Sequence, residues 1–74
     1  MTKFQWTVQR MDLLERAVRE HRRVALNRRG TEYVVVALSV TTVKARDAMV
    51  GRLPMTGEEM TFILDELDSF AIVG

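Results

Sequence analysis

Apolar residues recur every three or four positions near the start of the chain, which is the spacing of one face of a helix. The stripe within residues 7–22 consists of Met11, Leu14, Ala17, Val18 and His21. Thr7 is a suitable N-cap, and Trp6 and Met11 have the spacing of a hydrophobic staple around it. We therefore expect a helix over residues 7–22, preceded by a flexible arm over residues 1–6.

A second pattern, over residues 23–40, is typical of a β-hairpin. The segment 33–38 is an unbroken apolar run that contains three consecutive valines, and β-branched residues favour strands. A run that is apolar on both faces indicates that both faces are covered. Gly30 precedes this run and is the natural turn residue, because glycine adopts a positive φ without steric cost.

Two loop lengths are compatible with a turn at this glycine. A two-residue loop over residues 29–30 places Val24 opposite Val35, whereas a three-residue loop over residues 28–30 places Val24 opposite Val34. A slip of one residue exchanges the two faces of the strand, so the choice decides which side chains are buried. We prefer the three-residue loop, because it gathers the aliphatic side chains on one face. That expected core face consists of Val24, Leu26, Val34, Val36, Leu38 and Val40.

The rest of the chain, residues 48–73, is expected to supply the remaining strands. Residues 48–53 form the third strand, in which Gly51 indicates a bulge, a bend or the close approach of another backbone. The segment 57–70 supports two structures, since it has a capping box and helical spacing but also the run Thr61-Phe62-Ile63, which disfavours a helix. We favour strand, corner and strand here, and a C-terminal helix over residues 57–70 is the alternative.

These elements predict a single domain over residues 1–74 that is mainly β with one N-terminal helix. Their order is that of a small SH3-like or Sm-like barrel of about five strands. The alternative last third would make the fold α+β, with the order α-β-β-β-α.

Two short segments resemble the WYL domain of bacterial regulators. Residues 62–67, with the sequence Phe-Ile-Leu-Asp-Glu-Leu, are similar to the terminal strand motif of that family, and residues 23–26 after the helix are similar to its opening. The Trp-Tyr-Leu signature would fall near residues 48–50 and is absent, and Glu66 replaces the arginine of the terminal motif. The resemblance implies a small barrel, and a role in sensing nucleotides or nucleic acids.

The net charge of +1 conceals a strong asymmetry along the chain. All eleven Lys and Arg and five of the ten acids lie in residues 1–52, which therefore carry +6. Residues 53–74 hold the other five acids and carry −5. The two parts of the chain are expected to attract each other, either within one molecule or between copies.

The composition argues against an enzyme. There is no cysteine, a single histidine and no glycine-rich phosphate loop, so we expect no thiolate or histidine metal site and no cofactor. His21 lies on the helix stripe, where a half-buried structural histidine is the usual case. No apolar run is long enough to span a membrane, and the absence of cysteine suits the cytoplasm.

Two binding functions remain. A domain of 74 residues has a marginal core, and without disulfides or metals it gains stability most readily by association, so self-association through edge strands is the first hypothesis. A nucleic-acid or nucleotide-binding module is the second, since arginines bind phosphate and an aromatic ring stacks on a base. Its candidate residues are Arg22, Arg23, Arg28, Arg29 and Tyr33.

Overall fold

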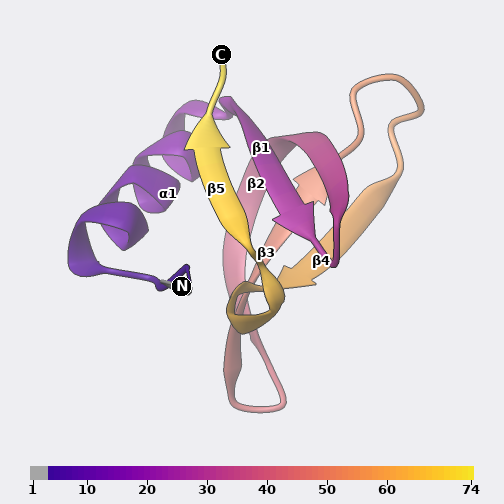
Figure 1. The fold of residues 1–74 in the computed structure, drawn as a ribbon. Helices are drawn as coiled ribbons and strands as arrows, with labels where there is room; N and C mark the ends of the chain where they lie inside the picture. Colours follow the sequence, from indigo (N-terminus) through magenta and orange to yellow (C-terminus); the bar gives the residue numbers. More distant parts are fainter. Residues whose placement is uncertain (1–3) are drawn as a thin grey trace.

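The structure is a computed structural model that describes residues 4–74, and in this range it contains one helix and one antiparallel sheet (Figure 1). The elements in chain order are α1 (Val8–Glu20), β1 (Arg23–Arg28), β2 (Thr31–Val43), β3 (Arg46–Arg52), β4 (Glu59–Ile63), the 3₁₀ turn η1 (Leu64–Glu66) and β5 (Ser69–Ile72). The five strands lie in the order β4-β3-β2-β1-β5, so β4 and β5 are the outermost. The prediction of a mainly β fold with one N-terminal helix is confirmed.

The helix α1 begins where the sequence indicates. The Thr7 hydroxyl accepts a hydrogen bond from the amide of Arg10 at 3.1 Å, which satisfies one of the free amides of the first turn. The helix ends at Glu20, because His21 adopts the left-handed conformation with φ 51°. His21 is therefore exposed at the C-cap, and its expected half-buried place on the helix stripe is wrong.

Trp6 ties the start of the helix to the far end of the chain. Its indole Nε1 donates a hydrogen bond to the carbonyl oxygen of Leu64 at 2.8 Å, and its ring lies 5.2 Å from that of Phe70. Trp6 and Met11 both pack against the core. Residues 1–3 of the expected arm lie outside the described residues, whereas Trp6 is part of the packed structure.

The first hairpin has a two-residue loop, so the preferred three-residue loop is wrong. Arg28 pairs with Thr31, and Val24 lies opposite Val35. The loop residues Arg29 and Gly30 have φ of 53° and 82°. Two consecutive positive φ angles are those of a type I′ turn, which matches the right-handed twist of the flanking strands. The twist of the ladder therefore outweighs the cost of placing Arg29 in the left-handed region.

The core face of β2 consequently differs from the expected one. Val35 and Ala37 are buried, whereas the side chains of Val34 and Val40 are 40% and 37% exposed. The face changes within the strand, because the register against β3 shifts between Ala37 and Ser39 and so leaves a bulge. A single alternation rule over residues 34–40 cannot describe such a strand. Of the expected core face, only Val24 and Leu26 are fully buried.

Gly51 lies where the two halves of β2 meet. It pairs with Ala37, and a Cβ atom at position 51 would lie 2.5 Å from Cγ2 of Val35. Of the three expectations for Gly51, the structure shows a close approach, but by the side chain of Val35 and not by another backbone, and only a glycine leaves room for it. Val35 belongs to the core, whose buried members are Leu14, Ala17, Val24, Leu26, Val35, Ala37, Met49, Phe62, Leu64 and Leu67.

The last third of the chain is strand, corner and strand, so a helix over residues 57–70 is excluded. Thr56 does not cap a helix; its hydroxyl accepts the amide of Glu58 in the turn between β3 and β4. Gly57 has φ 77° in the same turn. Phe62, in the middle of β4, is completely buried, and η1 then turns the chain into β5.

Candidate functional site

The five residues proposed for nucleic-acid binding do not form one group. Arg22 and Arg23 precede or begin β1, whereas Arg28 ends it and Arg29 follows in the turn. Five residues of extended chain span roughly 17 Å, so the two arginine pairs lie at opposite ends of the strand. The structure brings Arg28 together with Tyr33 and leaves Arg22 and Arg23 apart from them. Nucleic-acid binding stays a prediction, to be checked by filter binding at low salt, where phosphate contacts are strongest.

Arg28 is already engaged by aromatic rings. Its guanidinium carbon lies 5.3 Å from the ring centroid of Tyr33 and 5.2 Å from that of Phe62, both within the range of a cation–π interaction. The two rings contact each other edge to face at 5.3 Å. Tyr33 is half-buried in this cluster, so its ring faces protein and is a poor platform for a base.

The acidic residues of the last third lie close to basic groups of the same chain. Arg46 lies 3.8 Å from the carboxylates of both Asp65 and Glu66, and a carboxylate oxygen of Asp68 accepts the amide of Arg29 at 3.1 Å. These groups are on the surface, where ion pairs contribute about 0–1 kcal/mol each. The charge asymmetry of the sequence is thus partly compensated within one molecule.

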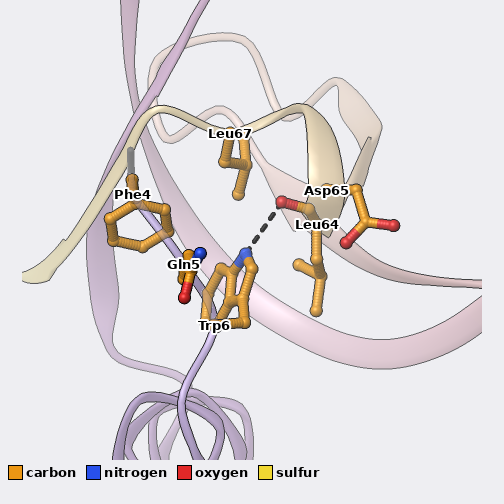
Figure 2. A pocket seen from close by; sticks show the side chains of 6 residues that line it. All are labelled: Phe4, Gln5, Trp6, Leu64, Asp65 and Leu67. Atoms are coloured by element: carbon orange, nitrogen blue, oxygen red, sulfur yellow. Dashed lines mark hydrogen bonds between the residues drawn. The ribbon is translucent and has the colours of Figure 1, made fainter. Parts of the chain in front are cut away.

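Two hollows lie beside Trp6. One, shown in Figure 2, has a volume of about 360 Å³ and is lined by Phe4, Gln5, Trp6, Leu64, Asp65 and Leu67. The other, of about 320 Å³, shares Trp6, Leu64 and Asp65 with it and extends to the β2–β3 turn. The indole N–H is already used by the Leu64 carbonyl, so it is not free to bind a ligand (Figure 2). The walls of both hollows lack histidine, serine and cysteine, and their acidic residues are Asp65 in both and Asp47 in the second.

Residues 4–74 contain no group of three His, Cys, Asp or Glu side chains that could hold a metal ion. Within the same residues, no helix has the length and hydrophobicity needed to cross a membrane.

The outermost strand β5 presents unpaired backbone groups. The amide of Val73 donates to the carbonyl of Arg23 at 2.9 Å, so position 73 is directed toward β1. Because ladder bonds alternate along an antiparallel strand, Ala71 is also directed toward β1. The N–H and C=O groups of Phe70 and Ile72 therefore point away from the sheet.

The alternation of hydrogen bonds along β4, the other outermost strand, likewise shows which of its residues are directed away from the sheet. The amide of Leu53 donates to the carbonyl of Glu58 at 2.8 Å, which makes Met60 and Phe62 the positions directed toward β3. The backbone groups of Glu59, Thr61 and Ile63 therefore point outward. No strand of the described residues pairs with these groups or with those of β5.

The solvent face beside β5 has an apolar part, which lies between Arg23 at one end and the Asn27–Ser69 pair at the other. Ala25 lies between Val34 and Ala71 in the paired strands, and none of the three belongs to the core. Val73 follows on the same face and is 55% exposed. This surface, defined by Ala25, Val34, Ala71 and Val73, is named the β5 patch.

The sequence predicts the strands but not which of them are outermost, so it does not locate these edges. It predicts Trp6 only as a staple, because the bond to Leu64 depends on a contact across most of the chain. A lone tryptophan next to an N-cap is the one signal in the sequence that points to this anchor.

No protein family model, curated protein or solved structure is significantly similar to this chain.

Proposed function

We propose that this protein is a small, non-enzymatic, barrel-like domain that acts by associating with further copies of itself through its outermost strands. A single observation carries the proposal. Both outermost strands, β4 and β5, have outward-directed backbone groups and no second partner within residues 4–74. Unpaired strand edges are templates for pairing with another chain.

Neither strand carries a lysine, a proline or a bulge, although acidic residues flank β4. Monomeric proteins protect edge strands with lysine, proline or a bulge. β4 and β5 are each paired with their inner neighbour in a continuous register. The β5 patch adds apolar surface directly beside one of the edges.

The barrel-like shape and the Sm-like or WYL-like character belong to the same proposal. The strand order places consecutive strands side by side from β1 to β4 and returns β5 to β1, and the bulge in β2 bends the sheet. An open sheet bent in this way has two edges to cover. Association would cover them, which supports an accessory or regulatory module over a catalytic one.

Sedimentation velocity of the full chain over a wide range of protein concentrations tests the proposal. We expect the weight-average sedimentation coefficient to rise with protein concentration. A variant that carries both Thr61→Lys and Ala71→Lys places a charge on each edge at exposed positions and is expected to remain monomeric.

The matched control carries Val8→Lys and Met55→Lys, which add the same two charges at residues that are 76% and 94% exposed and lie outside the strands. It should associate like the original chain. A chain that stays monomeric at every concentration, or a control that loses association equally, contradicts the proposal.

A further inference from the structure

We infer that the copies pair through β5 alone, antiparallel about a two-fold axis at Ala71. This inference rests on the proposed function and names the partner surface within it. Three pairings of the outermost strands are conceivable: β5 with β5, β4 with β4, and β4 of one copy with β5 of the next. The faces of the strands and the charges at their ends distinguish them.

The first argument concerns the faces of the sheet. The outward backbone groups of β5 belong to Phe70 and Ile72, whose side chains pack against the core. Those of β4 belong to residues such as Glu59 and Thr61, whose side chains are exposed to solvent. Residues directly opposite in an antiparallel pair project to the same face of the sheet. Pairing β4 with β5 would therefore join the solvent face of one copy to the core face of the next, whereas pairing β5 with β5 joins like faces.

The second argument concerns the register. Only one two-fold register pairs both outward residues of β5 with each other, namely Phe70 of each copy opposite Ile72 of the other. Ala71 then lies opposite Ala71 of the second copy, between the two hydrogen-bonded pairs. The core side brings together the apolar side chains of Phe70 and Ile72, and the solvent side makes the two β5 patches continuous.

The third argument concerns charge at the ends of β5. In this register Asp68 lies opposite Gly74 of the second copy. Arg22 is beside Gly74, since its Nε donates to the Gly74 carbonyl at 3.1 Å. Each end of the paired strands would thus bring an exposed carboxylate next to a guanidinium of the other copy.

Pairing β4 with β4 gives the opposite result. The equivalent register places Glu59 opposite Ile63, so Glu58 and Glu59 of one copy lie beside Asp65 and Glu66 of the other. Four acids would gather at each end of the pair against two arginines, namely Arg46, which lies 3.8 Å from Asp65 and Glu66, and Arg52, which is paired opposite Glu59. Each end would therefore keep a net negative charge, which opposes pairing. The β4 edge is therefore protected by its flanking acids, and the β5 edge is not.

Cysteine cross-linking tests the axis, because the chain has no cysteine of its own. At a two-fold axis between non-hydrogen-bonded residues the Cα atoms lie about 4.5 Å apart, within the range of a disulfide. We expect Ala71→Cys to form a disulfide dimer rapidly under mild oxidation. Thr61→Cys, in the middle of β4, should react no faster than Met55→Cys, which reports random collision at a fully exposed loop.

The alternative pairings give distinct outcomes. Rapid dimers of Thr61→Cys alone would assign the interface to β4. Disulfide dimers that form only when both Thr61→Cys and Ala71→Cys are present would assign the interface to β4 of one copy and β5 of the other. Either result overturns the inference but keeps the proposed function. Association without cross-linking at either edge overturns both.

Two variants of opposite charge, tested alone and as a mixture, examine the contact between Asp68 and Arg22 at the ends of the paired strands. Recovery in the mixture cannot be explained by a loss of stability in either variant. Asp68→Arg places two arginines at each end of its own dimer, and Arg22→Glu places two acids there, so both variants should associate at least tenfold more weakly than the original chain. In a mixture of the two variants, one end of the mixed dimer pairs the introduced arginine with the introduced glutamate. The other end keeps the original Arg22 and Asp68. We expect the mixture to recover association as a heterodimer, resolved by native mass spectrometry, and no recovery would overturn the inference.

Discussion

The two hairpins of strand β2 make the same turn from very different residues. The turn between β1 and β2 has φ of 53° and 82° at Arg29 and Gly30, and the turn between β2 and β3 has 50° and 65° at Lys44 and Ala45. Only the first contains a glycine, and only the first has a sequence that indicates a tight turn. The second shows that the ladder on either side can impose positive φ on ordinary residues.

The flanking strands explain this difference. The second hairpin pairs Thr42 with Asp47 and Val43 with Arg46, with a single register up to the loop. That register leaves two residues for the turn, whatever their identity. A non-glycine residue in the left-handed region costs about 1–2 kcal/mol, which the completed ladder must offset. The following predictions test how much each hairpin depends on the residues in its turn and on Gly51 between the two halves of β2.

The largest effect is expected at Gly51, where the two hairpins meet. Gly51→Ala places a Cβ 2.5 Å from Cγ2 of Val35, and overpacking of this kind costs about 1–3 kcal/mol. Urea denaturation measures the loss. The same change made together with Val35→Ala should cost less than the sum of the single changes, since the obstructing methyl group is gone. Full additivity would show that the contact is not the cause.

Gly30→Val is expected to be next, and to damage the first hairpin more than any other change within its turn. Nothing lies within 4 Å of a Cβ at position 30, so the cost comes from φ of 82° alone. A β-branched residue in this conformation loses about 1–3 kcal/mol. Gly30→Asn is the control and should lose much less, because asparagine tolerates positive φ. Equal losses for the two variants, measured by thermal unfolding, would contradict the backbone explanation.

A stabilising effect is expected from Ala45→Gly in the second hairpin. Relief of the left-handed alanine outweighs the entropy that glycine adds to the unfolded chain, leaving a gain of about 0.5 kcal/mol. The same substitution at Ala25, inside β1, should instead destabilise by about 0.5–1 kcal/mol. Opposite signs for the two variants in denaturant unfolding are the expected result, and a loss at both positions would contradict it.

Arg29→Asn is expected to have the smallest effect, a gain of roughly 0.3 kcal/mol in the first hairpin. Asparagine followed by glycine is the preferred pair for a two-residue turn of this type. The amide of residue 29 would still donate to Asp68, so that contact is retained. A destabilisation would show that the Arg29 side chain contributes to the fold, and differential scanning calorimetry can detect either sign.

The sequence predicts the elements of this protein better than their pairing. The helix stripe, the Thr7 cap and the strand run of residues 33–38 are local patterns, and each is found at its predicted place except that His21 lies beyond the helix. The strand preference of the run Thr61-Phe62-Ile63 likewise proves stronger than the helix start indicated by the capping box, and Phe62 is buried as part of a strand. Local patterns succeed where the physical preference lies within neighbouring residues.

The candidate arginines show where local patterns fail. They are close in sequence, but an extended strand between Arg23 and Arg28 separates them in space. Arg28 instead lies over Phe62, which belongs to β4 at the far side of the sheet order. The sequence also does not predict the unpaired backbone N–H and C=O groups of Phe70 and Ile72, because only the strand order makes β5 outermost.

By itself the sequence determined that the chain has one N-terminal helix and a valine-rich hairpin, and it favoured a strand at Phe62 and an unusual local geometry at Gly51. Propensity, capping and glycine geometry act over a few residues, so they can be read directly. Only the tertiary structure decided the loop length of the first hairpin, the buried face of β2 and the two free edges. Those features depend on the bulge after Ala37 and on strand order, which the whole sheet sets by satisfying its twist and its hydrogen bonds together.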